Sequence, residues 1–245
     1  MILVTGGSRG IGAATAILAA TRGYRVVISY RDNRAAAGHV LAAIEEAGSD
    51  AVAVQADVAV EADVEQLFAT LDARMGRLDA LVNNAGVLAT QMRVADMSAA
   101  RILRTLSVNV VGPFLCAREA VRRMSTARGG HGGAIVNVSS RAAQYGSPRE
   151  YVDYAASKGA LESFTTGLAQ EVAEEGIRVN AVRVGHVYTD IHASGGEPNR
   201  VDRVKHTVPM KRGGQPDEVA RAILWLLSPE ASYSTGTFLD VSGGR

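Results

Sequence analysis

Several features that would restrict the class of this protein are scarce in its sequence. The 245 residues include one cysteine, Cys116, so an intrachain disulfide is excluded and a reducing, cytoplasmic location is expected. Charge is balanced, with 26 Lys and Arg against 25 Asp and Glu, so no nucleic-acid partner is indicated. No uncharged stretch is longer than the 13 residues from Thr105 to Ala117, too short to cross a membrane as a helix. Metal-ligand spacings such as H-E-x-x-H or paired C-x-x-C do not occur, so no metal site is expected.

Apolar residues, by contrast, make up 47% of the chain and can fill a large core. Four glycines each end a helical pattern and precede an apolar run, which predicts alternating helices and strands in a parallel sheet. They are Gly23, Gly48, Gly76 and Gly176. We expect seven strands, near residues 2–5, 25–30, 51–55, 79–83, 134–139, 177–183 and 237–241. No linker divides the chain, so residues 1–245 are expected to form one doubly wound Rossmann domain with helices on both faces of the sheet. The first apolar run begins at residue 2 and leaves no room for a removable targeting segment.

Residues 2–17 contain a strand, a glycine turn and a helix in that order. Gly6, Gly10 and Gly12 interrupt the apolar run, and residues at helical spacing follow them. Glycine has no Cβ to block a close approach, and a helix N-terminus offers free N–H groups and partial positive charge. The turn therefore predicts a site for the phosphates of a dinucleotide.

A second cluster of reactive residues lies in the second half of the chain. The apolar run at 134–139 ends at Ser139 and Ser140, and Tyr154 and Lys158 are four residues apart on one helix face. An ammonium group near a phenol favours the phenolate, so Tyr154 is expected to exchange protons more readily than a free tyrosine. Tyr145 and Tyr151 have no lysine four residues later and are interpreted as wall or packing residues.

Together these motifs resemble the short-chain dehydrogenase/reductase family over essentially the whole chain, particularly its 3-oxoacyl-[acyl-carrier-protein] reductases and glucose 1-dehydrogenases. The matching elements are T-G-G-S-R-G-I-G at 5–12, N-N-A-G at 83–86, Asn109, Ser140, Y-x-x-x-K at 154–158 and G-x-x-x-T at 185–189. The resemblance implies hydride transfer between a nicotinamide and a carbonyl or secondary alcohol. In it Ser140 polarises the carbonyl, Tyr154 is the general acid or base, Lys158 holds the nicotinamide ribose, and Asn109 supports a water relay.

The resemblance also implies which residues hold the cofactor. They are Gly6, Ser8, Arg9, Gly10, Ile11, Gly12, Arg31, Asp57, Val58, Asn84, Ala85, Gly86, Tyr154, Lys158, Val187 and Thr189. At the end of the second strand, Tyr30 replaces the carboxylate typical of NAD-binding sites. Arg31 and Arg9 could instead clamp a 2′-phosphate, so NADP(H) is expected to be preferred, with NAD(H) as the alternative. If the two arginines are only solvated surface residues, this preference does not follow.

The sequence departs from the family pattern in two places. Ser140 precedes Tyr154 by 14 residues, one more than is usual, which predicts an insertion between Gln144 and Glu150. Val184 replaces the proline that usually precedes Gly185, which is expected to loosen that turn. Residues 190–214 are aperiodic and basic, and in the family this segment caps the substrate pocket.

Several alternatives remain open. The motifs do not separate a 3-oxoacyl-thioester reductase from a sugar or polyol dehydrogenase, and the basic residues at 200–212 mark either an anionic substrate or a solvated surface. His186 and His192 are interpreted as hydrogen-bonding rather than reactive residues. A catalytically silent NADP(H)-binding regulator would lack Ser140, Tyr154 or Lys158, and a methyltransferase would leave the Tyr/Lys pair unexplained. The final segment, 233–243, resembles the family's oligomer-forming tail, so a homotetramer is expected, with a dimer second.

Overall fold

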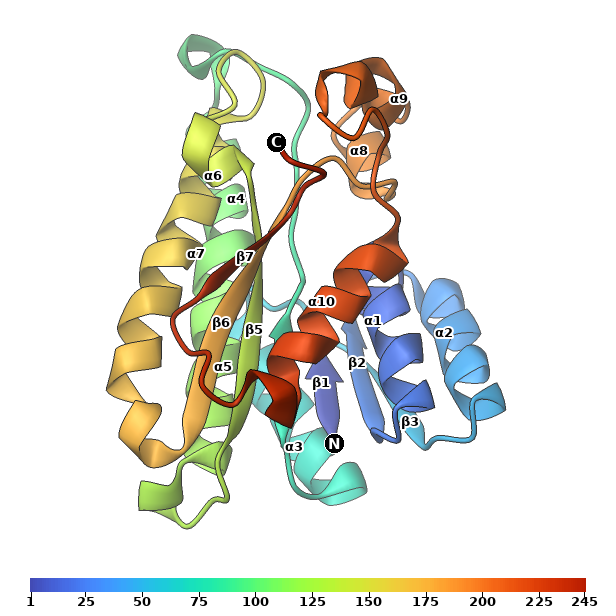
Figure 1. Cartoon of the computed structure of the whole chain (residues 1–245), viewed down its shortest axis with the longest axis vertical. Helices are drawn as coiled ribbons and strands as arrows, with labels where there is room; N and C mark the ends of the chain where they lie inside the picture. Colours follow the sequence, from blue (N-terminus) through green and yellow to red (C-terminus); the bar gives the residue numbers. More distant parts are fainter.

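A computed structural model describes residues 1–245, and one parallel sheet of seven strands runs through the centre of the chain (Figure 1). The strand order is β3-β2-β1-β4-β5-β6-β7. The strands are β1 (Ile2–Val4), β2 (Val26–Tyr30), β3 (Ala51–Gln55), β4 (Ala80–Asn83), β5 (Gly133–Ser140), β6 (Ile177–Val184) and β7 (Phe238–Val241). All seven coincide with predicted strands to within one or two residues, so the predicted fold class is confirmed.

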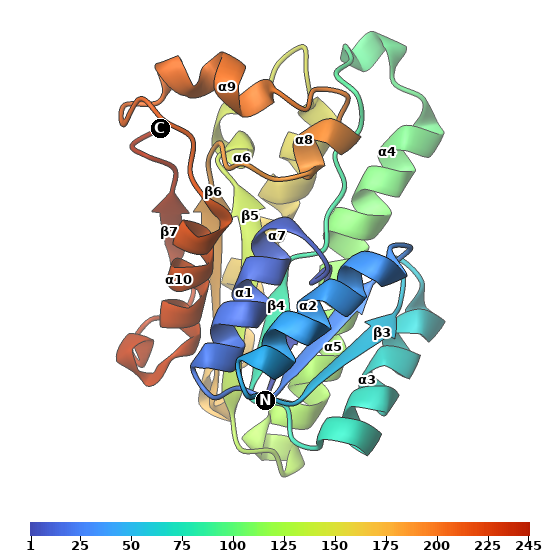
Figure 2. The ribbon, with the colours of Figure 1, turned by 90° about the vertical axis from the view of Figure 1, so that its right-hand side faces the viewer.

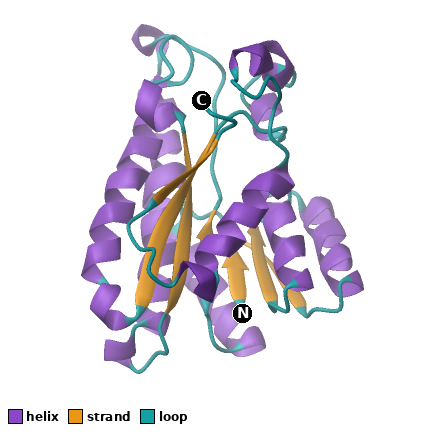
Figure 3. Cartoon of the chain, in the orientation of Figure 1, coloured by secondary structure: helices purple, strands orange, loops and turns teal.

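Helices cover both faces of this sheet (Figures 2 and 3). The helices are α1 (Gly10–Thr21), α2 (Arg34–Glu46), α3 (Glu61–Met75), α4 (Ala99–Leu106), α5 (Gly112–Met124), α6 (Ala142–Tyr145), α7 (Val152–Glu171), α8 (Ile191–Ser194), α9 (Arg200–Val204) and α10 (Pro216–Leu227). Short 3₁₀ turns lie at Val94–Asp96, Thr126–Arg128, Ala173–Glu175, Lys205–Thr207 and Pro229–Ala231, and a π-helix lies at Ser107–Val111. No helix is both long and apolar enough to span a membrane.

Two hydrophobic cores result, because successive side chains of a strand point to opposite faces. In β1, Ile2 and Val4 pack into the core beneath α1, α2 and α10, whereas Leu3 packs into the core beneath α3, α5 and α7. Every residue of β1, β2 and β4 is buried, as expected for central strands of a parallel sheet covered on both sides.

The strand order changes direction between β1 and β4, which both leave the sheet toward the same side. The chain after β1 runs to α1 on one face, and the chain after β4 runs toward the other face, so a crevice opens between them. Thr5 joins the two exits, because its hydroxyl oxygen accepts the N–H groups of Asn84 and Ala85 at 3.0 and 3.1 Å. Helices α8 and α9 lie above this end of the sheet (Figure 2).

Candidate active site

The glycine turn after β1 packs closely against the chain that follows β4. Gly6 and Gly10 have left-handed backbones, with φ of 61° and 54°, and a Cβ on Gly6 would lie 2.9 Å from the Cα of Ala85. Gly12 lies in the first turn of α1, where a Cβ would be 2.4 Å from the carbonyl oxygen of Gly6. These contacts bring the N-terminus of α1 to the rim of the crevice.

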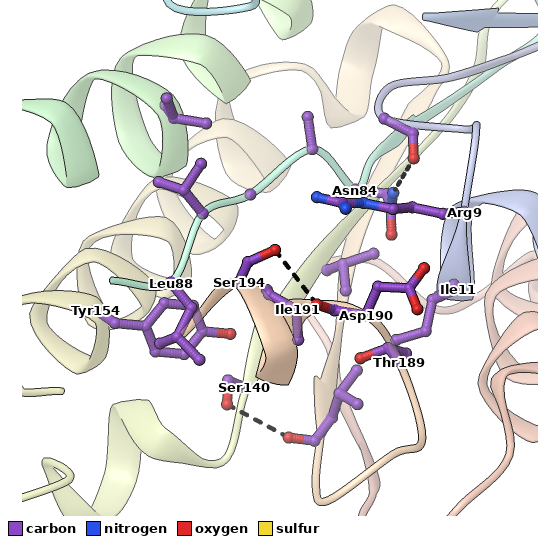
Figure 4. A pocket seen from close by; sticks show the side chains of 18 of the residues that line it. Arg9, Ile11, Asn84, Leu88, Ser140, Tyr154, Thr189, Asp190, Ile191 and Ser194 are labelled. Carbon is purple, nitrogen blue, oxygen red and sulfur yellow. Dashed lines mark hydrogen bonds between the residues drawn. The ribbon is translucent and has the colours of Figure 1, made fainter. Parts of the chain in front are cut away.

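One cavity of about 530 Å³ extends along this crevice. Figure 4 looks into it, with Tyr154 and Ser140 on one side and Arg9 and Ile11 on the other. The predicted site residues that line it are Gly6, Ser8, Arg9, Gly10, Ile11, Arg31, Asp57, Val58, Asn84, Ala85, Gly86, Ser140, Tyr154, Lys158, Val187 and Thr189. Gly12 and Asn109 lie outside the lining.

Tyr154 and Lys158 occupy adjacent turns of α7, where Lys158 is buried and Tyr154 is half-buried. The Nζ of Lys158 donates a hydrogen bond to the carbonyl oxygen of Val138 at 2.7 Å and lies 5.6 Å from the centre of the Tyr154 ring. Ser140, at the end of β5, accepts the N–H of Ala142 at 3.1 Å.

Burial controls the protonation of this pair. Burial raises the pKa of Tyr154 to about 12, although the nearby hydroxyl of Ser140 acts in the opposite direction. Burial also lowers the pKa of Lys158 to about 8. The pKa of Tyr154 is therefore raised rather than lowered as expected, because the loss of hydration is the largest influence on it.

Asn109 lies behind the cavity wall, in the π-helix between α4 and α5. Its Oδ1 accepts the N–H of Val87 at 2.8 Å, and its Nδ2 donates to the carbonyl oxygen of Val87 at 3.0 Å and to the hydroxyl of Ser157 at 3.1 Å. The side chain thus ties the chain after β4 to α7. A Cβ on Gly86 would lie 3.5 Å from the Asn109 Oδ1 and 3.8 Å from the Lys158 Nζ, so the three groups are neighbours. The extra residue of a π-helix turn is a local feature that often occurs at functional sites.

The far end of the cavity contains the residues expected to distinguish the two nicotinamide cofactors. Tyr30 is buried at the end of β2, and Arg31 is exposed and forms an ion pair with Asp32. Arg9 is exposed and has no carboxylate partner. Asp57 is held by Arg104 through an ion pair of 2.9 Å, a partner that no motif in the sequence indicates.

The two departures from the family pattern lie at the end of β6 and in the loop before α7. Val184 is the last residue of β6, and its carbonyl oxygen accepts the N–H of Arg141 at 3.0 Å. In the loop predicted to contain the insertion, Ser147 and Arg149 have left-handed backbones with φ of 45° and 65°, which is uncommon outside glycine. Ser140 and Tyr154 nevertheless line the same cavity.

Residues 190–214 form α8, α9 and a 3₁₀ turn beside the Tyr154 end of the cavity. The side chains that line this end without having been predicted as site residues include Leu88, Tyr145, Tyr151, His186, His192 and Arg200. Tyr145 and Tyr151 form part of its wall, as expected. No sequence pattern indicates Leu88, which shares no spacing with Tyr154, and Arg200 was expected only as one of the basic residues of the capping segment.

Comparison with known proteins identifies the class to which this fold and site belong. A family model described as "Enoyl-(Acyl carrier protein) reductase" matches residues 6–245. The solved structure of a short chain dehydrogenase from Burkholderia cenocepacia in complex with NADP superposes with a TM-score of 0.91, at 35% identity over 99% of this chain and 96% of that one. The chain belongs to the short-chain dehydrogenase/reductase family of oxidoreductases.

Two further relatives show how close the match is. The chain is 59% identical to the uncharacterized oxidoreductase YgfF of Escherichia coli, over 99% of this chain and 98% of that protein. A 3-ketoacyl-(acyl-carrier-protein) reductase from Brucella melitensis, solved in complex with NADH, superposes with a TM-score of 0.91 at 34% identity. That alignment covers 100% of this chain and 97% of the reductase.

Proposed function

We propose that this protein is an NADP(H)-dependent oxidoreductase that transfers a hydride between the nicotinamide and a carbonyl or secondary alcohol, with Ser140, Tyr154, Lys158 and Asn109 as its catalytic set. One observation carries the proposal. Tyr154 and Ser140 line the same cavity as the glycine turn. A phosphate-binding device and a proton donor thus face one space that can hold both a dinucleotide and a small substrate.

The residues of the cavity fit a nicotinamide dinucleotide. The glycine turn has no room for Cβ atoms, which suits a close approach of the backbone to a pyrophosphate at the start of α1. Asp57 and Val58 would contact the adenine, Lys158 the nicotinamide ribose, and Val187 and Thr189 the carboxamide. Arg9 and Arg31 would bind the 2′-phosphate.

The protein's own groups would handle the proton and the carbonyl oxygen. The bound, reduced cofactor supplies the hydride that adds to the carbonyl carbon. Tyr154 gives its proton to the carbonyl oxygen, and the hydroxyl of Ser140 orients that oxygen by a hydrogen bond. With a pKa of about 12, Tyr154 is protonated at neutral pH, which is the form that carbonyl reduction requires. Asn109 fixes the wall beside Lys158, from which protons can be returned to Tyr154.

The Tyr154→Phe variant tests this assignment. It removes the transferable proton and little else, so NADPH should bind with unchanged affinity in a fluorescence titration while ketone-dependent oxidation of NADPH falls by about 10²-fold or more. Activity equal to that of the wild type would show that Tyr154 is not the acid. NADPH binding without turnover of any ketone by the wild type would favour the silent regulatory protein.

The preference for NADP(H) has its own test. Arg9 and Arg31 face the cavity, but Arg31 is already paired with Asp32, a carboxylate that could instead accept a ribose hydroxyl. Steady-state kinetics should give a higher kcat/KM with NADPH than with NADH, and Arg9→Ala should reduce that ratio by about 10-fold. Arg34→Ala, an exposed residue of α2 outside the cavity, is the matched control. A ratio favouring NADH in the wild type would overturn the preference.

We also propose that α8 and α9 cap the substrate and that the protein is a homotetramer, with a dimer as the second choice. Strand β7 lies at the edge of the sheet and is not covered by a further strand, and Tyr233 before it is fully exposed. An edge strand of this kind can be covered by a second copy. Light scattering coupled to size-exclusion chromatography measures the assembly directly, and a monomer at micromolar concentration would refute it.

A further inference from the structure

Two polar atoms are buried without a hydrogen-bond partner at the Tyr154 end of the cavity. They are the hydroxyl oxygen of Tyr151 and the Nδ1 of His192. Tyr151 is 3% exposed and directly precedes α7, and His192 is 9% exposed and lies in α8. Both side chains line the cavity. Buried polar groups are nearly always paired, so two unpaired atoms on residues that line one cavity point to a ligand that supplies their partners.

The hydrogen bond on the other side of the His192 ring defines what Nδ1 can do. The Nε2 of His192 lies 3.0 Å from the carbonyl oxygen of Val187, which can only accept, so the ring proton is on Nε2. Burial, aided by the charge of Arg200, lowers the pKa of His192, so the ring is neutral at pH 7. The Nδ1 is therefore a bare acceptor, and it requires a donor such as a hydroxyl group.

His186 offers the complementary group. Its Nε2 lies 2.6 Å from the guanidinium of Arg245, which can only donate, so Nε2 accepts and the ring proton is on Nδ1. Burial lowers the pKa of His186 to about 4, and the charge of Arg245 contributes. His186 is thus a neutral donor beside the neutral acceptor His192, and the Tyr151 hydroxyl can act in either way.

Most charges of the segment above this end of the cavity are paired, whereas Arg245 has no carboxylate partner and donates instead to His186 and to the hydroxyl of Thr207. Arg200, which lines the cavity as Lys158 does, pairs with Glu150 at 2.5 Å and with Glu197 at 3.1 Å. Arg203 forms ion pairs with the same two carboxylates. Farther along the segment, Lys205 and Arg212 each pair with a neighbouring carboxylate. The basic character of residues 200–212 in the sequence is therefore largely neutralised, so this segment gives no reason to expect an anionic substrate or an acidic carrier.

We propose that Tyr151 and His192, with His186, form a subsite for the hydroxyl groups of a small uncharged hydroxyketone, or of the polyol that is its reduced form. The proposal rests on the function proposed above and names its substrate class. A substrate hydroxyl donates to the Nδ1 of His192, and another exchanges a hydrogen bond with Tyr151, while the carbonyl lies between Ser140 and Tyr154. The subsite thus selects among ketones by their hydroxyl groups rather than by charge or chain length.

A panel of matched ketones tests the substrate class with the full-length protein and NADPH. Butan-2-one and erythrulose share four carbons but differ in their hydroxyl groups, acetoacetate carries a carboxylate, and acetoacetyl-pantetheine is a thioester. We expect kcat/KM for erythrulose to exceed that for butan-2-one by about 10-fold or more, because a site built for hydroxyls leaves its polar groups unpaired with the deoxy compound. Acetoacetate and the thioester should be poorer than erythrulose.

The Tyr151→Phe variant tests the residues. It removes a hydroxyl that has no protein partner, so its melting temperature should be no lower than that of the wild type. The erythrulose/butan-2-one ratio should fall by about 10-fold, because only the hydroxylated ketone loses a hydrogen bond. Tyr24→Phe is the matched control, since Tyr24 lies outside the cavity lining, and its ratio should match that of the wild type.

The remaining outcomes contradict the proposal in separable ways. Equal rates for erythrulose and butan-2-one would mean that the orphan atoms hold only water, and a preference for the thioester or acetoacetate would assign the other substrate class. Both results leave the proposed oxidoreductase function intact. A melting temperature lowered by Tyr151→Phe would mean that the hydroxyl has a protein partner after all. Absence of NADPH oxidation with every ketone would overturn both this inference and the proposed function.

Discussion

The Gly12→Ala substitution offers a sharp test of the crevice, because one methyl group would enter a space that is already full. The added Cβ would lie 2.4 Å from the carbonyl oxygen of Gly6 and 2.5 Å from the Nδ2 of Asn84. Ordinary van der Waals contacts begin near 3.4 Å, so the turn must move by roughly 1 Å. This movement would also stretch the 3.0 Å hydrogen bond that the Nδ2 of Asn84 donates to the carbonyl oxygen of Gly6. That bond joins the turn to the chain after β4.

The size of the effect follows from three contributions. Overpacking costs about 1–3 kcal/mol, the weakened Asn84 bond costs about 1 kcal/mol, and replacing glycine in a helix returns about 1 kcal/mol. The net loss of about 1–3 kcal/mol should lower the melting temperature by about 2–4 °C for each kcal/mol. Since the moved backbone is the proposed phosphate cradle, the Kd for NADPH should rise by about 10-fold or more.

Gly38→Ala in α2 is the matched control for this experiment. Gly38 is also a helical glycine, but no atom lies within 4 Å of its added Cβ, and the residue is outside the cavity. It should gain about 0.5–1 kcal/mol of stability from helix propensity and leave the Kd unchanged. Differential scanning fluorimetry and fluorescence titration with NADPH measure both quantities. The packing argument would be refuted if Gly12→Ala melted as high as Gly38→Ala and bound NADPH with the affinity of the wild type.

Three further predictions concern buried charges. The guanidinium of Arg178 donates to four carbonyl groups at 2.7–3.3 Å, so Arg178→Ala should cost about 3 kcal/mol, and an unchanged urea midpoint would contradict this. Asp153 forms a buried ion pair with Arg101 at 2.8 Å that holds its pKa below the usual range despite the opposing effect of burial. The ion pair stabilises the fold fully above the pKa that Asp153 has in the unfolded chain, and this stabilisation disappears as the pH falls through the pKa of Asp153 in the folded protein. Asp153→Asn should therefore cost about 3 kcal/mol of stability at pH 7 and little at pH 2. A cost that does not change with pH would refute this reasoning. Burial lowers the pKa of Lys158 to about 8, so the cation opposes folding below that pH, and wild-type stability should rise between pH 8 and 10 relative to Lys158→Met. Lys158→Met should melt higher at pH 7 yet lose turnover, and a lower melting temperature would show that the hydrogen bond to Val138 matters more.

Much of the fold could be predicted because its signals are local. A buried strand of a parallel sheet is apolar on both faces, so a continuous apolar run such as residues 26–30 predicts a strand. Tyr154 and Lys158 belong to one helix, where a separation of four residues brings two side chains to the same face whatever else the chain does. The π-helix that carries Asn109 could not be predicted, because it depends on packing between α4, α5 and α7 rather than on composition.

Primary structure was thus sufficient for the order of the strands along the chain, the glycine turn and the Tyr154–Lys158 pair, each set by neighbours within a few residues. Three-dimensional packing alone decided the protonation of Tyr154, the tautomers of His186 and His192, and the meeting of Tyr151 with His192 at one cavity. The reason is that hydration, hydrogen-bond partners and local charge come from groups distant in sequence. Arg200 is charged wherever it lies and has Glu197 three residues away, but only the fold brings Glu150, 50 residues away in sequence, beside it.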